Sequence, residues 1–388
     1  MNRVVLLLFV LFKTIDAAAI ELHPEVVAIQ KDLINLSTHK NVGEVFERHQ
    51  NVLSENNLDT QSRDLIHQFI ATYFSFIGLH QRAERLYQFG QSISQQQALD
   101  NFTAYDALDE ITALAKKNRL LMVNEAHHIP KHRWLTKELL IRLKREGYSY
   151  LALEALAKKD EQRINKQGYA TNKSGIYMRD PAFSELISVA KELGYTLVSY
   201  DKYSYDREKE GAENIINKTF ALDPDAKVIV HCGYSHIDEK HKLASILAAN
   251  LHIDPLTIDQ TALLSTHIPD IYKNTPVVFK SDTEQYWQPT NSHFDIAVYW
   301  PAQTQITNRP AWYMANHQRQ RLNETWCNNA FPCYVEVVNN INEAIPFDRY
   351  LWLNPAIPAS VRVRAGDSIF VYDKFGKQVR QLNSPFIK

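Results

Sequence analysis

The sequence predicts an α/β protein with a largely parallel sheet flanked by helices, an N-terminal helical cap and a C-terminal β-rich region. Between residues 106 and 260, short apolar runs alternate with amphipathic stretches of helix length, which is typical of a parallel sheet covered on both faces. Before this segment, apolar residues recur every three or four positions, as in helices. After residue 270, aromatic and β-branched runs are separated by Pro, Asn and Gly, as in strands joined by turns.

Composition defines the class of protein and excludes some partners. The chain has 388 residues, of which 45% are hydrophobic and 22% charged, so it is an ordinary globular protein with room for two or three domains. Lys and Arg total 43 against 44 Asp and Glu. This balance gives no electrostatic case for nucleic acid or an anionic membrane as a partner. A small-molecule substrate is the partner that the candidate site described below implies. The oligomeric state is not fixed by these patterns.

The first 19 residues predict a signal peptide. Arg3 precedes the apolar run from Val4 to Phe12, and small residues follow at 17–19. That run is shorter than the ~20 residues that span a bilayer, and no later run reaches this length. We therefore expect a periplasmic or secreted protein without a membrane span.

Three cysteines fit that location. Cys327 and Cys333 flank the loop-like segment Asn-Asn-Ala-Phe-Pro, which predicts a disulfide between them. Cys232 is then left alone, and its place at the end of an apolar strand favours an inert buried thiol over a catalytic one.

Residues 20–100 are predicted to form the helical N-terminal region. Helical periodicity is present in EVVAIQKDLINL, DLIHQFIATYFSFIGL and AERLYQF. Gly78 marks a tight turn between the last two of these helices. The polar stretch 91–101 is the predicted boundary with the next region.

Residues 101–270 are predicted to form the α/β core, and 271–388 the β-rich region. The core strands are Leu120–Val123, Tyr150–Leu153, Thr196–Ser199, Lys227–Val230 and Leu256–Ile258. The helices between them are expected at 132–146, 181–193, 208–219 and 239–250. In the C-terminal region, GDSIFVYDKFGKQVR predicts a hairpin that bends at Phe375 and Gly376.

Polar residues follow four successive core strands where each strand ends. They are Asn124-Glu125-Ala126-His127-His128, Glu154, Tyr200-Asp201 and His231-Cys232-Gly233-Tyr234-Ser235-His236. Because the carboxyl ends of parallel strands meet at one edge of the sheet, we expect these side chains to share one crevice. Four tyrosines are candidates to line it: Tyr177, Tyr200, Tyr203 and Tyr205.

These residue types are suited to two kinds of chemistry. A carboxylate at the end of a buried strand needs a cation, a proton or a metal, and the nearby candidates are the histidines and Arg207. A carboxylate beside an imidazole can make water a nucleophile at neutral pH, whereas the same groups could instead bind a divalent metal. Because His127 and His128 are consecutive and point in different directions, at most one is expected to be the principal catalytic group.

Other common catalytic motifs do not occur in the sequence. There is no Gly-x-Ser-x-Gly elbow, Gly-rich phosphate loop, Cys-x-x-Cys or His-Glu-x-x-His. These absences disfavour a serine hydrolase, a nucleotide enzyme and a zincin.

The order of the motifs resembles the erythromycin esterase-like superfamily, which is related to haem- or iron-binding proteins and Tiki-type metalloproteases. Asn124-Glu125-Ala126-His127-His128 is similar to its first motif, although Asn124 stands where that family usually has Gly. Leu-Ala-Leu-Glu154-Ala, the segment from Asp206-Arg207 to Asn214, the strand ending at His231, and Gly233-Tyr234-Ser235-His236 follow in the family's order. The resemblance covers roughly residues 105–260.

The resemblance implies a role for each residue. Glu125 and Glu154 would be paired acids. His128, or His127 under the shorter spacing, would be the general base. Arg207 would steady substrate or transition-state charge, and His231 and His236 would complete the pocket. The esterase branch implies no cofactor, whereas the related branches imply a divalent metal or haem.

The sequence therefore predicts a secreted hydrolase that activates water with a Glu/His constellation to cleave an ester, lactone or amide. Two alternatives remain open. One is a metal-dependent peptidase that uses the same residues as ligands. The other is a non-catalytic periplasmic protein that binds haem, iron or another ligand.

Overall fold

The computed structural model describes residues 23–385 except 37–39, 56–57, 89–98, 100, 203, 265, 267, 269–274, 303 and 342. The predicted signal peptide, residues 1–19, and most of the predicted boundary stretch 91–101 lie outside the described residues. Within the described ranges, no helix combines the length and apolar character needed to cross a membrane.

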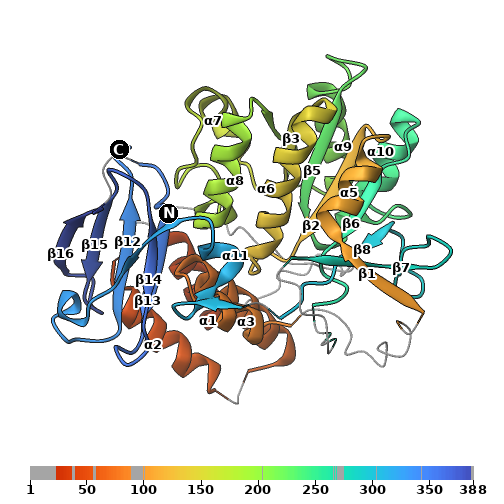
Figure 1. Cartoon of the computed structure of the whole chain (residues 1–388). Helices are drawn as coiled ribbons and strands as arrows, with labels where there is room; N and C mark the ends of the chain where they lie inside the picture. Colours follow the sequence, from red (N-terminus) through yellow and green to blue (C-terminus); the bar gives the residue numbers. More distant parts are fainter. Residues whose placement is uncertain are drawn as a thin grey trace.

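A six-stranded parallel sheet forms the core and confirms the predicted fold class (Figure 1). All five predicted core strands are present, and a sixth short strand follows residue 270. They are β2 (Leu120–Glu125), β3 (Tyr148–Leu153), β4 (Thr196–Ser199), β5 (Lys227–Gly233), β6 (Leu256–Asp259) and β8 (Ile296–Ala297). Their order is β4-β3-β5-β2-β6-β8, so β5 and β2 lie side by side at the centre.

Helices cover both faces of this sheet, because alternate side chains of each strand point to opposite faces. Leu121 and Val123 of β2 pack on one face, whereas Leu120 and Met122 pack on the other. The first face is covered by α5 (Ala107–Ala115), α6 (Lys131–Leu143) and α8 (Pro181–Glu192), and the second by α9 (Arg207–Lys218) and α10 (Leu243–Leu251). The predicted helices between the strands are therefore confirmed.

Two helices of the core are absent from the sequence prediction: α5, which precedes β2, and α7 (Glu161–Gln167). The seven residues of α7 bury only Ile164, so this segment carries no helical periodicity to detect. Short 3-10 helices complete the core and its loops: η2 (Lys144–Glu146), η3 (Lys158–Asp160), η4 (Tyr177–Arg179), η5 (Tyr234–Ile237) and η6 (Glu324–Cys327).

The N-terminal region is helical, as predicted. It contains α1 (Pro24–Asn35), α2 (Val42–Leu53), α3 (Thr60–Phe76) and α4 (His80–Leu86). Asp59 caps α3 by accepting a hydrogen bond from the backbone N–H of Ser62 at 2.9 Å. Gly78 makes the predicted turn between α3 and α4 with a φ of +79°, and a Cβ at this position would collide with the backbone oxygen of Arg349.

Strands after residue 270 form two groups. β7 (Val277–Ser281) pairs antiparallel with β1 (Phe102–Asp106) beside the core, and β8 extends the parallel sheet. The later strands form the antiparallel sheet β13-β12-β15-β16 and the small pairs β11-β14 and β10-β9. Their bounds, with the short helix α11 (Ala311–Met314), are β9 (Gln305–Ile306), β10 (Arg309–Pro310), β11 (Gln318–Arg321), β12 (Cys333–Val338), β13 (Asp348–Trp352), β14 (Ser360–Val363), β15 (Ser368–Tyr372) and β16 (Gln378–Asn383).

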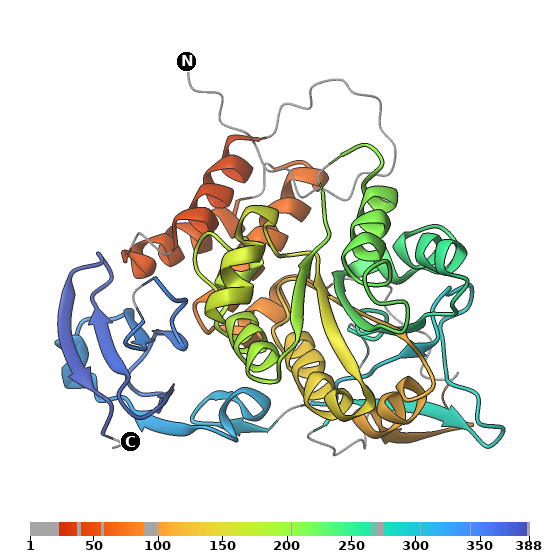
Figure 2. The same cartoon turned by 90° about the horizontal axis from the view of Figure 1, so that it is seen from above.

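The C-terminal strands pack against the N-terminal helices, and the two views show them on the opposite side of the molecule from β6 and β8 (Figures 1 and 2). The backbone N–H of Leu351 donates to the oxygen of Ile77, and that of Glu44 donates to the oxygen of Lys374. A single hydrophobic cluster contains residues of the helical cap, the parallel sheet and the C-terminal sheet. The three regions therefore share one core.

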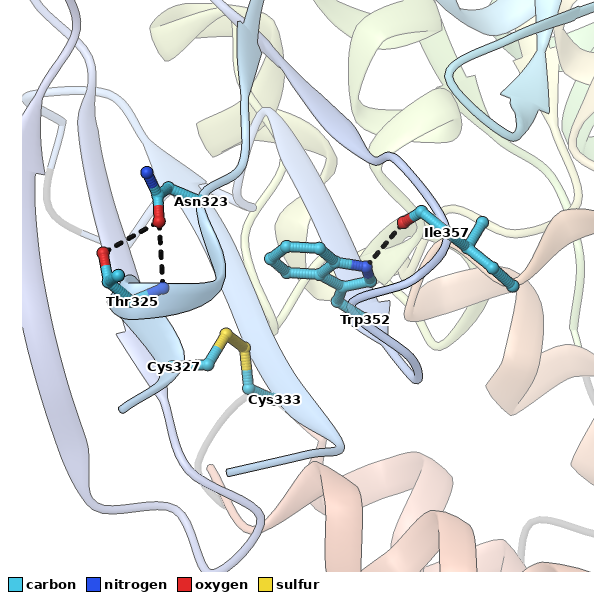
Figure 3. Close-up of a disulfide and its surroundings, with 6 residues drawn as sticks. All are labelled: Asn323, Thr325, Cys327, Cys333, Trp352 and Ile357. Carbon is cyan, nitrogen blue, oxygen red and sulfur yellow. Dashed lines mark hydrogen bonds between the residues drawn. A yellow bond between two sulfur atoms is a disulfide. The ribbon is translucent and has the colours of Figure 1, made fainter. Parts of the chain in front are cut away.

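The predicted disulfide and the predicted hairpin are both present. Cys327 and Cys333 are joined, with their Cα atoms 5.9 Å apart, at the beginning of β12 (Figure 3). The Asn323 side chain caps the N-terminus of η6, the short helix before β12, by accepting hydrogen bonds from the N–H and hydroxyl of Thr325. The hairpin between β15 and β16 bends with Gly376 at a φ of +86°.

Candidate active site

Glu125 ends β2 and lies at the centre of a buried polar cluster. Its carboxylate is bound by Arg133 of α6, whose Nε lies 2.7 Å from Oε2 and Nη2 lies 3.0 Å from Oε1. His127 approaches Oε1 at 2.8 Å, and His231 of β5 approaches Oε2 at 2.9 Å. Glu125 and Arg133 are 1% and 0% exposed. One carboxylate therefore holds two imidazoles and one guanidinium.

The charge of this carboxylate is stabilised despite its burial. Burial alone would raise the pKa of Glu125, but the charge of Arg133 and the hydrogen bonds from His127 and His231 hold the pKa well below its usual range. Arg133 also lies 3.2 Å from the carboxylate of Asp180, at the beginning of α8. Glu125 is therefore ionised at neutral pH, so it is an acceptor and not a proton donor.

His127 is the imidazole of this cluster that shares the space beside Gly233 with a second carboxylate, Glu154. Its Nδ1 contacts Glu125, whereas its Nε2 lies 2.7 Å, and Oε2 of Glu154 3.0 Å, from the position that a Cβ on Gly233 would take. The ring stacks on Tyr177, with centroids 3.9 Å apart, and meets Tyr234 edge to face at 5.1 Å. The carboxylate and the two aromatic rings therefore fix the orientation of His127.

His128 is not brought into this cluster. Its Nε2 lies 2.7 Å from the backbone oxygen of Tyr87, and its ring packs against the ring of that residue. Burial lowers the pKa of His128 to about 3, so it stays neutral. The structure therefore places His128 against the helical cap and gives it no hydrogen bond with Glu125 or Glu154.

His231 contacts Glu125, but both of its ring nitrogens are engaged, since Nδ1 lies 2.9 Å from the hydroxyl of Thr136. The next residue, Cys232, points to the other face of the sheet, where its thiol approaches the backbone oxygen of Val123 at 3.7 Å. Burial raises the pKa of this thiol well above its usual value. Cys232 therefore stays outside the cluster.

A second cluster surrounds Glu154, which follows β3. Arg207, the first residue of α9, donates from Nη2 to Oε1 of Glu154 at 2.6 Å and binds both oxygens of Asp201 at 2.7 and 2.9 Å. His236 of η5 lies 3.6 Å from Oε1 through Nε2, and its Nδ1 contacts Glu208 at 2.9 Å. Oε2 of Glu154 accepts a short hydrogen bond from the backbone N–H of Gly233.

The charges in this second cluster are well defined. Burial would raise the pKa of Glu154, but the nearby positive charges of His236 and Arg207 lower it. Burial would lower the pKa of His236, but Glu154 and Glu208 raise it to about 10. At neutral pH, Glu154 is therefore an anion held between the cations His236 and Arg207.

The two clusters meet at Gly233, the last residue of β5. A Cβ at this position would lie 2.7 Å from Nε2 of His127 and 3.0 Å from Oε2 of Glu154. The backbone φ of Gly233 is −86°, which any residue can adopt. The site therefore requires a residue without a side chain at position 233, because only then can the imidazole and the carboxylate both approach the end of β5.

Asn124 holds the strand ends around this site. Its Nδ2 donates to the backbone oxygen of Tyr234 at 2.8 Å and to Asp259 of β6 at 2.7 Å, while Oδ1 accepts from the N–H of Gln260 at 2.7 Å. Tyr234 has a φ of +42°, which is rare for a residue with a side chain. The Asn124 amide thus fixes the sharp bend that follows β5.

The donor set of the first cluster does not fit a metal ion. Each oxygen of Glu125 is already bound by the Arg133 guanidinium, which would lie beside any cation placed there. His231 has no ring nitrogen left for a metal. His127, His128 and His231 are all at most 6% exposed, so none presents an open axial position for haem.

Several residues of the site are missing from the sequence prediction. Arg133 is the most important, and its sequence signal is a charged residue on the apolar face of a predicted helix, three positions before Thr136 and seven before Leu140. Glu208 is another, because its place in a predicted helix gives no sign of its contact with His236. Of the four tyrosines, Tyr177 lines the site, Tyr200 packs under α9, Tyr205 is exposed and Tyr203 lies outside the described residues.

The fold and the buried ion cluster define an α/β protein with a carboxylate–imidazole site at the carboxyl ends of its parallel strands. No family model and no curated protein matches the sequence. Among solved structures, the chain is similar to the type III effector HopBA1, with a TM-score of 0.34 and 15% identity over 53% of this chain and 97% of that one.

Two further solved structures show a comparable similarity. The haem-binding ChaN of Campylobacter jejuni has a TM-score of 0.33 and 11% identity over 52% of this chain and 98% of that one. RRSP, a MARTX toxin effector domain from Vibrio vulnificus, has a TM-score of 0.31 and 15% identity over 62% of this chain and 50% of that one. These values do not assign the chain to a family, so the erythromycin esterase-like resemblance stays a prediction.

Proposed function

We propose that this protein is a hydrolase that activates water with His127 to cleave an ester, lactone or amide. The observation that carries the proposal is the 2.8 Å contact between Glu125 and Nδ1 of His127, together with the position of Nε2 and Glu154 Oε2, which both lie beside Gly233. A carboxylate on one ring nitrogen fixes the tautomer in which the other nitrogen is a base. His127 is therefore the general base of the proposed reaction.

The reaction needs one proton to move twice. Nε2 of His127 accepts a proton from water while the water oxygen bonds to the carbonyl carbon of the substrate. The imidazolium then donates that proton to the leaving oxygen or nitrogen as the C–O or C–N bond breaks. Glu125 and Glu154, both ionised, stabilise the imidazolium formed between these two steps.

Arg207 is suited to stabilise the oxyanion that develops on the carbonyl. Its side chain is 27% exposed, and its contacts with Glu154 and Asp201 use Nε and Nη2. Nη1 takes no part in these contacts. A fixed guanidinium in a partly dry site stabilises developing negative charge without reorganising.

The experiment is to compare wild-type protein with the Glu154→Gln variant on chromogenic esters, lactones and amides. We expect the variant to lose about 100-fold or more in kcat/KM, because the carboxylate that stabilises the imidazolium is removed. Glu161→Gln is the matched control, since Glu161 also pairs with a cation of α9, Lys218, but lies outside the two ion clusters. Full activity of Glu154→Gln on every substrate that the wild type cleaves would reject the mechanism.

We also propose that the mature protein is periplasmic or secreted. The disulfide between Cys327 and Cys333 supports an oxidising compartment, and residues 1–19 have the sequence of a signal peptide. N-terminal sequencing of the protein recovered from its native compartment should begin near residue 20. A chain that retains Met1 there would contradict this location.

A further inference from the structure

Three potential metal ligands converge outside the proposed active site. Asp238 follows η5, His241 lies three residues later, and His293 lies in the connection between β7 and β8. Nδ1 of His241 lies 3.3 Å from Oδ1 of Asp238, and Nδ1 of His293 lies 3.3 Å from Oδ2. Their ligand atoms all lie within 4.8 Å of one another. We call these three residues the Asp238 cluster.

The backbone holds this arrangement in place. Oδ1 of Asp238 accepts hydrogen bonds from the backbone N–H groups of Lys240 and His241, both at 2.8 Å. Oδ2 is therefore the oxygen directed away from the turn. The N–H of Glu239 donates to the backbone oxygen of His293 at 2.9 Å, which joins the two segments directly beside the cluster. The ligands are thus brought together by contacts that do not need a metal.

The spacing is close to that of a zinc coordination sphere. Zinc binds imidazole nitrogen and carboxylate oxygen at about 2.0–2.2 Å in a tetrahedron, which places neighbouring ligand atoms about 3.3–3.5 Å apart. The two imidazoles lie 3.3 Å from different oxygens of the Asp238 carboxylate, and one ligand atom from each of the three residues lies within 4.8 Å of the others. Two imidazoles also favour zinc and similar transition metals over calcium or magnesium, which prefer oxygen ligands alone.

We propose that Asp238, His241 and His293 bind one divalent transition metal of the zinc class, with water as the fourth ligand. The His241 side chain is 58% exposed, so an ion can enter from solvent. The metal would join the segment after η5 to the connection between β7 and β8. Because His236 lies two residues before Asp238 and contacts Glu154, the ion would stiffen the segment that carries His236 without taking part in the chemistry.

The test is a titration of the full-length protein, free of any polyhistidine tag and treated with chelator, with zinc and with cobalt. We expect calorimetry to show one equivalent of bound zinc and the melting temperature to rise when zinc is added. We also expect bound cobalt to show the visible absorption of a four-coordinate ion. Mutation of a residue that only orients a metal ligand typically weakens metal binding by about 10- to 100-fold. Removal of a ligand itself, in His241→Ala or His293→Ala, should therefore weaken zinc binding by about 100-fold.

Two controls separate this site from the rest of the chain. His252→Ala removes an exposed histidine at the end of α10 and should leave binding unchanged. Glu125→Gln should also keep the zinc equivalent, because the proposed active site does not supply ligands. Absence of binding to the wild type, equal binding by the His241 and His293 variants, or loss of binding in Glu125→Gln would each overturn the proposal. None of these readouts depends on hydrolysis, so they are independent of the proposed function.

Discussion

Replacing Gly233 by Ala perturbs the point where the two ion clusters meet. The new Cβ would lie 2.6 Å from Cε1 of His127, 2.7 Å from Nε2 and 3.0 Å from Oε2 of Glu154. Since the φ of Gly233 is −86°, the backbone itself accepts Ala without strain. The substitution therefore acts on the position of His127 and Glu154 and not on the strand.

The size of the effect follows from these distances. Ordinary van der Waals contacts of a Cβ begin at 3.4 Å, so the imidazole must move by about 0.8 Å. A displacement of about 1 Å in a catalytic group lowers the rate by about 100-fold, which corresponds to about 2.7 kcal/mol in activation free energy. Overpacking of this kind also lowers the free energy of unfolding by about 1–3 kcal/mol.

The assay is kcat/KM for hydrolysis of a chromogenic ester, together with urea denaturation, at a temperature where both proteins are folded. Gly211→Ala in α9 is the matched control, because its Cβ would meet the Tyr200 ring at 3.3 Å and Leu243 at 3.6 Å, neither of them in the two ion clusters, and Ala favours the helix. We expect an unchanged kcat/KM for the control. If Gly233→Ala also keeps wild-type kcat/KM while folded, His127 and Glu154 do not act from the positions described.

Further predictions concern pH, the buried arginine and the disulfide. The folded pKa of His236 is raised from 6.5 to about 10, so its contribution to stability is complete below pH 6.5 and is lost as the pH rises towards 10. Urea denaturation across this range should show a decline that His236→Gln reduces, and an equal decline in both proteins would contradict it. Arg133→Met should lower the unfolding free energy by about 3–5 kcal/mol, because it leaves the Glu125 carboxylate buried without its guanidinium. Arg142→Met, at a surface ion pair, should change it by less than about 1 kcal/mol, and equal effects would show that the buried pair is not special. Replacing Cys327 and Cys333 by Ser should lower the unfolding free energy by about 2 kcal/mol, and unchanged thermal denaturation of this variant would argue against a stabilising role.

The parallel core and its strand ends could be predicted from sequence because both depend on local patterns. Apolar runs of strand length fixed β2 to β6, and the residue after each run had to lie at the carboxyl edge of the sheet. A second rule, that consecutive side chains point in different directions, predicts that His127 and His128 diverge, and in the structure His127 contacts Glu125 while His128 contacts Tyr87. That rule does not say which of the two histidines lies beside the carboxylates.

The remaining features depend on tertiary packing that the sequence does not encode locally. His128 contacts the backbone oxygen of Tyr87 through Nε2. Tyr87 belongs to the N-terminal helical region, and the sequence gives no sign that this region lies beside His128. Arg133 pairs with Glu125 only because α6 lies across the end of β2. β8, of two residues, is too short for a pattern, although it extends the core sheet beyond residue 270.

The role of His127 as general base is tested most directly by comparing kcat for His127→Gln and His128→Gln on the same ester. We expect His127→Gln to lower kcat by about 100- to 10,000-fold, because the general base is lost. We expect His128→Gln, corrected for the folded fraction, to keep wild-type kcat, because that ring contacts Tyr87 and the imidazole has a pKa of about 3. A loss of activity in the His128 variant with retention in the His127 variant would show that His127 is not the base.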